Sequence, residues 1–425
     1  MERKITSFLQ RWRKDNNRKP LLIYGPKQIG KTYSVLDFGR KYYKNVVYFN
    51  SENYAEFLKI FKTENTTEKI MFQLSLLSGE EIKKEETLVV IDNVNNNDIV
   101  KGIKKFGLEN SLYHIIMITS LKANLIRFKG EELQFKQMFA LDFEEYLMAK
   151  DNVQLVTFIK DSFKNNKPMP FHNVALDMFN EYVITGGMPE VVEASLNGAD
   201  LLTIKTIQSK IWDTYYKDFY RMKNLIDTPR SVEVMNSAVY QLRKENRKFQ
   251  YGLMGAGSRA KEYESSINFL SVNSFLYKVH KVSDIKSPLS SCKDKDSFKL
   301  YFNDTGLLFN SLNISRMRFL TDQKLKNLVY ENSVAIALSQ QNMNVYYYQS
   351  EGKSGLSFVI QNRTGNIVPI ELVNKDLSKS KSLGIFMKKY TVFEAIRITE
   401  DNFSKKKNIK YIPVYATFCL NDLRI

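Results

Sequence analysis

The sequence predicts an α/β fold whose first part is built on a parallel sheet, with a helical region and a second mixed region after it. Two observations lead to this prediction. Four short apolar runs between residues 20 and 142 alternate with longer amphipathic stretches, and a glycine-rich segment joins the first run to the first helical stretch. Runs of four to six residues that are apolar on both faces are typical of parallel strands covered by helices.

The expected strands and helices of this first part follow directly from the pattern. The four runs are residues 21–24, 46–49, 88–91 and 115–118, and a helix-period segment such as 33–43 lies between neighbouring runs. From residue 143 to about residue 223 the strand signal vanishes, and apolar residues recur at helical spacing in 155–163, 176–184 and 201–219. Gly186 to Pro189 interrupts this helical region, and Pro189 suits the first turn of the next helix.

The remainder of the chain mixes helices with strands. Residues 265–276 have a helical pattern, and 279–282 together with 298–302 predict a wing-like hairpin. From Lys324 a helix is expected to precede three strands, at 345–348, 356–360 and 367–373.

Length and composition limit the class of protein. The chain has 425 residues, which at roughly 150 residues per domain suggests about three domains. Hydrophobic residues make up 43% and charged residues 26%, which excludes a disordered or fibrous chain. Lys and Arg outnumber Asp and Glu by 63 to 46, and the net charge of +17 makes a polyanion a candidate partner. The two cysteines and three histidines are scattered, so we expect neither a disulfide framework nor a metal centre built on them.

We expect a cytoplasmic protein without a membrane partner. The first residues lack the apolar segment of a signal peptide, and no run approaches the roughly 20 apolar residues of a membrane span.

The glycine-rich segment has the pattern of a phosphate-binding P-loop, G-x-x-x-x-G-K-[ST]. It consists of Gly25, Pro26, Lys27, Gln28, Ile29, Gly30, Lys31 and Thr32. The segment follows a predicted strand and opens a predicted helix, so its backbone N–H groups and the helix N-terminus would bind phosphate. Lys31 would reach the β- and γ-phosphates, and Thr32 would bind Mg²⁺. The expected ligands are therefore ATP and Mg²⁺.

The strand that ends at Asp92 supplies the second residue expected to bind Mg²⁺. Many ATPases carry a glutamate at the next position, where it polarises the attacking water, but this chain carries Asn93. An amide orients water without accepting its proton, so we expect nucleotide binding to be intact and hydrolysis to be slow or lost. Thr119 and Ser120 close the fourth strand, where a hydroxyl can sense the γ-phosphate. Lys31, Asp92, Asn93 and Ser120 are the predicted catalytic residues.

These residues, with further motifs along the chain, resemble a family of bacterial and archaeal AAA-type ATPases that have a C-terminal domain of unknown function. The further motifs are residues 19–22, 141–147, 186–190, 302–308, 367–371 and 412–416. The resemblance implies an AAA-type P-loop core, a helical subdomain, a winged-helix-like domain and a C-terminal restriction-endonuclease-like α/β domain. The expected boundaries are 1–142, 143–225, 226–315 and 316–425.

The C-terminal region departs from the metal site that the resemblance implies. Relatives carry Glu on a helix, then Asp, then Glu-x-Lys, a set that would bind Mg²⁺ and position water. Glu331 and Glu371 match this pattern, but Ser357 and Val373 stand at the Asp and Lys positions. We therefore expect no nuclease activity.

Basic residues suggest DNA as a second candidate partner. Arg259 matches an arginine of the family, which could contact a phosphate of nucleotide or DNA, cap a helix, or pair with a carboxylate. Basic clusters occur at 11–14, 243–248 and 405–407, and the second lies in the winged-helix-like region. The alternative to a slow ATPase is therefore a nucleotide-gated DNA-binding protein without catalytic activity.

Overall fold

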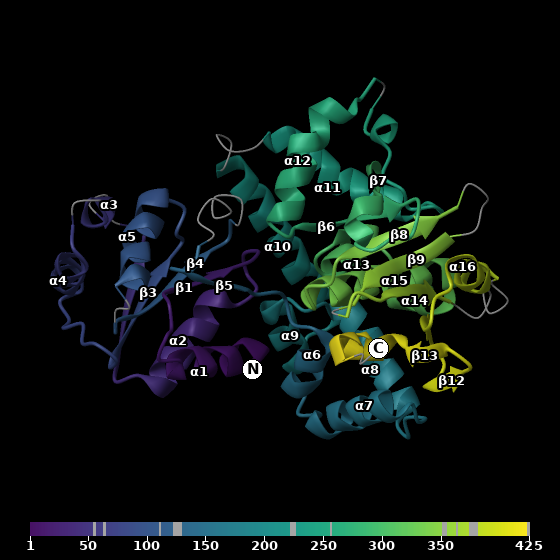
Figure 1. The fold of residues 1–425 in the computed structure, drawn as a ribbon, viewed down its shortest axis with the longest axis horizontal. Coiled ribbons are helices and arrows are strands. Elements are labelled where there is room, and N and C mark those ends of the chain that lie inside the picture. The colour runs from purple at the N-terminus through teal and green to yellow at the C-terminus, as the bar shows by residue number, and fades with distance from the viewer. Residues whose placement is uncertain are drawn as a thin grey trace. The chain divides into compact units, whose positions relative to one another are not determined.

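The computed structural model describes residues 1–53, 57–62, 65–109, 112–121, 130–221, 227–255, 257–350, 355–362, 364–373 and 381–422 (Figure 1). The chain divides into two compact units, of which the first holds residues 1–140 and 272–274 and the second holds the remaining residues. Within the described ranges, none of the helices combines the length and the apolarity that a membrane span requires.

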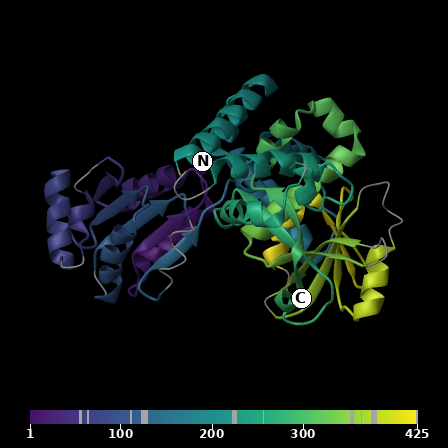
Figure 2. The ribbon, with the colours of Figure 1, turned by 90° about the horizontal axis from the view of Figure 1, so that it is seen from above.

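The first unit is a parallel sheet between helices, and all four predicted strands are confirmed (Figure 2). The strand order is β2-β3-β4-β1-β5, with every neighbouring pair parallel. The strands are β1 (Leu21–Tyr24), β2 (Asn45–Asn50), β3 (Thr87–Asp92), β4 (His114–Thr119) and β5 (Gln134–Gln137). The helices are α1 (Lys4–Lys14), α2 (Lys31–Tyr42), α3 (Phe57–Ile60), α4 (Thr67–Ser78) and α5 (Asn97–Leu108).

Successive side chains of these strands point to opposite faces of the sheet, and each face packs against its own layer of helices. Val47 and Val89 point into a core shared with α3, α4 and α5. Their neighbours Val46 and Leu88 point the other way, where Gly39 of α2 lies so close that a Cβ would touch both side chains. Because both faces of the sheet are covered, its central strands are apolar throughout, which is the pattern that predicted them.

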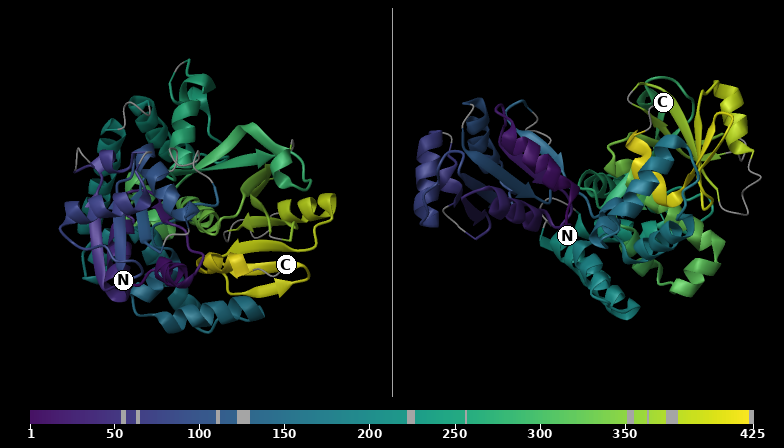
Figure 3. Two further views of the ribbon diagram at one scale, coloured as in Figure 1. Left: turned by 60° about the vertical axis from the view of Figure 1, so that its left-hand side comes forward. Right: turned by 90° about the horizontal axis from the view of Figure 1, so that it is seen from below.

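The second unit combines helices with an eight-stranded mixed sheet, in the order β12-β13-β11-β10-β9-β8-β6-β7 (Figure 3). The strands are β6 (Leu276–Val282), β7 (Lys293–Phe302), β8 (Val345–Gln349), β9 (Gly355–Gln361), β10 (Ile367–Leu372), β11 (Ala395–Thr399), β12 (Ser404–Lys406) and β13 (Ile409–Pro413). The helices are α6 (Phe143–Ala149), α7 (Val153–Asn165), α8 (His172–Thr185), α9 (Pro189–Leu196), α10 (Leu201–Arg221), α11 (Thr228–Leu242), α12 (Ala260–Val272), α13 (Thr305–Leu312), α14 (Arg316–Thr321), α15 (Gln323–Gln340) and α16 (Ser382–Tyr390), and the 3₁₀ segment η5 (Val414–Asp422) follows β13.

The predicted hairpin is confirmed as the antiparallel pair β6–β7, but it is also part of this larger sheet. Strand β6 pairs in parallel with β8, so the hairpin is continuous with the C-terminal strands. The prediction of a helix over 265–276 was wrong at its C-terminal end, because α12 ends at Val272 and Leu276 already belongs to β6. Ser274 adopts a left-handed φ of 62°, which turns the chain between the two elements.

Asp304 joins two of the motifs that lie far apart in the sequence. Its Oδ2 accepts a hydrogen bond from the Gly187 N–H at 2.6 Å, and its Oδ1 accepts one from the Leu307 N–H at 2.9 Å, which caps α13. Gly186 has a φ of 79°, and a Cβ there would overlap the Asp304 carboxylate. Burial raises the pKa of Asp304 to about 6.

Candidate functional site

The glycine-rich loop runs from the end of β1 to the start of α2, as the sequence predicts. Gly25 has a φ of 153°, and a Cβ on it would clash with the Met138 carbonyl oxygen. Gln28 and Gly30 adopt left-handed φ values of 63° and 84°. Glycine is thus required at the position where the loop leaves the strand, because the backbone of the segment after β5 passes directly against it.

Two buried cations hold this loop. Arg3, which is 7% exposed, donates from Nη1 to the Ile29 carbonyl oxygen at 3.0 Å and from Nη2 to that of Phe139 at 2.8 Å. Lys31, which is 8% exposed, donates from Nζ to the carbonyl oxygens of the first two loop residues at 2.8 and 2.6 Å. The Lys31 ammonium therefore folds back over the loop that was predicted to bind phosphate.

Thr32 and Asp92 lie in direct contact at the edge of the sheet. Thr32 Oγ1 donates to Asp92 Oδ2 at 2.6 Å, and the Tyr48 hydroxyl donates to the same oxygen at 3.1 Å. Burial and the neighbouring Asp92 carboxylate raise the pKa of Tyr48 to about 12, so this hydroxyl remains a donor. Hydroxyl and carboxylate oxygens suit Mg²⁺, so the residues present fit the predicted ion. Tyr48 was not predicted, because only the register of β2 against β3 brings it to Asp92.

Asn93 is held by the end of β2 through hydrogen bonds. Its Nδ2 donates to Asn50 Oδ1 at 3.2 Å, and its carbonyl oxygen accepts from Ser51 Oγ at 2.7 Å. Its φ of 56° lies in the left-handed region, which asparagine adopts more readily than glutamate. The backbone at this position therefore suits the residue that the chain carries.

Glu52 is a carboxylate at the same edge of the sheet. It follows β2, whose last residue Asn50 is in register with Asp92, and its Oε1 accepts from Asn95 Nδ2 at 3.2 Å. Glu52 is exposed, and its carboxylate is a candidate to accept a proton from water, which the Asn93 amide cannot do.

Ser120 follows β4, which lies between β3 and β1 in the sheet. The carboxyl ends of parallel strands meet at one edge, so Ser120 shares that edge with Asp92 and the glycine-rich loop. It is 9% exposed, and the hydroxyl of the preceding Thr119 accepts from the Leu121 N–H at 3.1 Å. A γ-phosphate-sensing role for Ser120 stays a prediction.

In the second unit, Glu331 is the centre of a buried cluster of charges. Glu331 Oε1 accepts from Lys299 Nζ at 3.0 Å and from the Tyr301 hydroxyl at 2.5 Å, and its other oxygen pairs with Arg247. Burial alone would raise the pKa of Glu331, but Arg247 and Lys299 lower it to about 2. The carboxylate is ionised and already neutralised by side chains of the protein.

Glu371 lies in a separate ion pair. Its Oε2 accepts from Nε and Nη2 of Arg397 at 3.0 and 2.7 Å. Glu371 is on β10, whereas the side chains that hold Glu331 come partly from β7, four strand spacings or about 19 Å away in the sheet. Ser357 Oγ accepts from the Leu372 N–H at 3.4 Å. Over the described ranges, no three His, Cys, Asp or Glu residues are grouped so that they could hold a metal ion.

The basic cluster 243–248 is partly used for internal contacts. Arg243 donates from Nη2 to the Leu312 carbonyl oxygen at 3.1 Å, and Arg247 pairs with Glu331. Arg259 is exposed, and its backbone N–H donates to Glu262 at the start of α12. DNA contact by this region and the role of the Arg259 side chain stay predictions.

No curated protein matches the sequence. Among solved structures, the chain is similar to a Walker-type ATPase of Pyrococcus abyssi, with 13% identity, 74% of this chain and 96% of that chain covered, and a TM-score of 0.43. It is also similar to the ORC1 protein of Aeropyrum pernix in complex with DNA, with 11% identity, coverage of 73% and 90%, and a TM-score of 0.29.

These structural likenesses are too distant to assign a function, and the family models are more specific. Residues 176–318 match a domain of unknown function, which spans part of the predicted helical subdomain and all of the predicted winged-helix-like domain. Residues 17–147 match an AAA domain, and this match supports an AAA-type, ATPase-like P-loop domain in the first unit.

Proposed function

We propose that the first unit binds ATP with Mg²⁺ and hydrolyses it slowly or not at all. The main support is the 2.6 Å hydrogen bond between Thr32 Oγ1 and Asp92 Oδ2, beside the glycine-rich loop. These are the two oxygens that would hold Mg²⁺, which when bound neutralises charge on the β- and γ-phosphates. The AAA-domain match over residues 17–147 supports the same assignment.

The residues of the loop would bind and orient the phosphates. The backbone N–H groups at the start of α2 supply fixed donors, and Lys31 would exchange its carbonyl partners for phosphate oxygens. Tyr48 donates to Asp92 and so keeps its carboxylate in place. Ser120 is placed at the same edge, where its hydroxyl would meet the γ-phosphate.

Slow hydrolysis follows from the chemistry of Asn93. Its amide can hydrogen-bond a water but cannot take a proton from it, and its Nδ2 is bound to Asn50. Positioning and charge stabilisation would still be available, so we expect weak turnover rather than a complete block.

A nucleotide-gated DNA-binding protein without catalysis is the second candidate. The net charge of +17 and the missing carboxylate at Asn93 favour it. Lys244 and Lys248 are then the residues of cluster 243–248 that would meet phosphate, since its two arginines have internal partners.

Steady-state phosphate release with and without DNA, paired with a nucleotide-binding titration, separates these candidates. A slow ATPase binds ATP and releases phosphate at a low rate. A non-catalytic switch binds ATP, releases none, and changes its DNA affinity when ATP is added. Absence of ATP binding would contradict both.

A further inference from the structure

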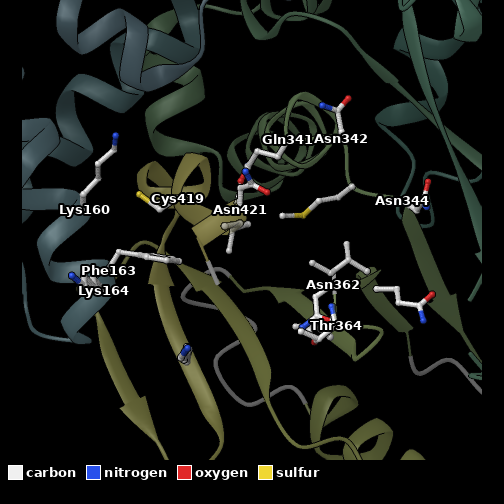
Figure 4. A pocket seen from close by; sticks show the side chains of 16 residues that line it. Lys160, Phe163, Lys164, Gln341, Asn342, Asn344, Asn362, Thr364, Cys419 and Asn421 are labelled. Carbon is white, nitrogen blue, oxygen red and sulfur yellow. Dashed lines mark hydrogen bonds between the residues drawn. The ribbon is translucent and has the colours of Figure 1, made fainter. Parts of the chain in front are cut away.

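A cavity of about 930 Å³ lies in the second unit, apart from the charged cluster around Glu331. Its walls come from α7, from the segment 341–344 after α15, from the turn between β9 and β10, and from η5 (Figure 4). Exposed side chains among the lining residues show that the cavity opens to solvent. Its volume is in the range of sites that bind small molecules.

Among the residues of the wall that the structure describes, the charged ones are all cationic. Lys160, Lys164 and Lys410 line the cavity, and no Asp or Glu with a described side chain does. Lys160 is bound to Glu144 at 2.5 Å and Lys410 to Glu394 at 3.2 Å, both outside the wall. Lys164 is exposed and makes no ion pair with any residue that the structure describes. The cavity therefore favours an anion, with Lys164 as its available partner.

An aromatic ring and several carboxamides complete the wall. Figure 4 shows Phe163 and Lys164 on one side of the cavity, with Asn342 and Asn344 on the opposite side. Phe163 is partly exposed, and both asparagines are exposed. A carboxamide offers a donor and an acceptor together, as the edge of a nucleobase does.

Part of the wall is fixed by internal hydrogen bonds. Gln341 donates to the carbonyl oxygens of Ala337 and Thr417 at 2.8 and 2.9 Å. Asn362 Oδ1 accepts from the backbone N–H groups of Thr364 and Asn366 at 3.1 and 2.8 Å. These bonds hold the two loops at the cavity rim in place, so a ligand would not have to order them.

We propose that this cavity binds an unpaired nucleotide of a single-stranded nucleic acid. The base lies between Phe163 and the asparagine carboxamides, and the phosphate meets Lys164. An aromatic face, base-edge amides and a cation are the means by which proteins bind unpaired nucleotides, whereas the bases of a duplex are paired and cannot enter.

Fluorescence anisotropy with a labelled oligothymidylate of about 20 nucleotides tests this site, at about 50 mM salt and without ATP. A measurement with oligouridylate distinguishes binding of RNA from binding of DNA, and a measurement with a duplex of equal length distinguishes binding of single strands from binding of double strands. Lys164→Glu should weaken single-strand binding about tenfold and reduce its salt dependence. Asn344→Leu should weaken binding and leave the salt dependence unchanged, since it removes no charge.

Lys295→Glu is the matched control, because Lys295 is an exposed lysine of β7 that does not line the cavity. The affinity of the Lys295→Glu variant for the single strand should stay within about twofold of that of the wild type. Cross-linking with bromouracil-substituted oligonucleotide should label peptides containing Phe163 or residues 342–344. The proposal is overturned if no single strand binds, if duplex binds as well, if both cavity variants bind like Lys295→Glu, or if the cross-links lie elsewhere.

Discussion

Replacing Asn93 with glutamate puts a carboxylate at the position where the chain carries an amide. If hydrolysis is slow because no group there accepts a proton from water, Asn93→Glu should raise the turnover of ATP. General-base catalysis contributes about 100-fold at its lower limit.

The geometry of Asn93 reduces the gain that we expect. Its φ of 56° disfavours glutamate and should lower the free energy of unfolding by about 1 kcal/mol. The hydrogen bond from Asn93 Nδ2 to Asn50 Oδ1 is also lost, and the new carboxylate faces that oxygen until the Asn50 amide turns to donate. We therefore expect turnover to rise about tenfold, which corresponds to a barrier about 1.4 kcal/mol lower.

Steady-state phosphate release at saturating ATP and Mg²⁺ measures this effect, with nucleotide affinity measured separately. Asn93→Gln is the matched control, because it places a longer side chain on the same backbone without a proton acceptor, and its turnover should not rise. A flat rate in Asn93→Glu with binding intact would refute the reasoning. If Glu52→Gln then abolished the ATP turnover that the wild type shows, Glu52 would be the proton acceptor.

Three further predictions concern the second unit. Glu331→Gln leaves Arg247 and Lys299 buried without a counter-charge and should lower the free energy of unfolding by about 3 kcal/mol in urea denaturation, whereas a change below about 1 kcal/mol would contradict the buried network. The pKa of Asp304 is raised to about 6 from 3.8, so its contribution to stability is complete below about pH 4 and is lost as the pH rises through about 6. Between about pH 4 and pH 6 the melting temperature of the wild type should therefore fall relative to that of Asp304→Asn. If the melting temperatures of the two proteins changed in parallel with pH, the raised pKa of Asp304 would be contradicted. The purified protein should not cut DNA with Mg²⁺ or Mn²⁺, and metal-dependent nicking that disappears in Glu371→Ala would show a working nuclease site.

Most of the first unit could be predicted from local sequence. Its central strands are continuous apolar runs, and the glycine-rich loop has a fixed spacing of residue types. Strand β5 was missed because residues 134–137 are mostly polar and only half-buried at the sheet edge. Arg3 was missed because its partners are backbone carbonyl oxygens at Ile29 and Phe139, which no side-chain pattern marks.

The second unit was harder to predict because its key contacts join distant segments. The strand patterns predicted the β6–β7 hairpin, but its pairing with β8 depends on how the whole sheet packs. Glu331 was identified by its place in a motif. Its partners were not, because Arg247 lies in the segment after α11 and Lys299 lies in β7. The sequence placed Arg247 in a basic cluster that was a candidate to contact DNA, whereas the structure gives it a buried partner in Glu331.

Equilibrium binding of ATP to the full chain, with and without Mg²⁺, tests the proposed nucleotide site most directly. We expect the wild type to bind ATP more tightly with Mg²⁺, and Lys31→Ala to weaken binding by about 100-fold because a buried cation beside the phosphates is lost. Lys41→Ala is the matched control, because this lysine lies on the same helix and its side chain is 59% exposed. The affinity of the Lys41→Ala variant for ATP should not change. Equal ATP affinity in the wild type and Lys31→Ala would contradict the assignment of residues 25–32 as the phosphate-binding loop.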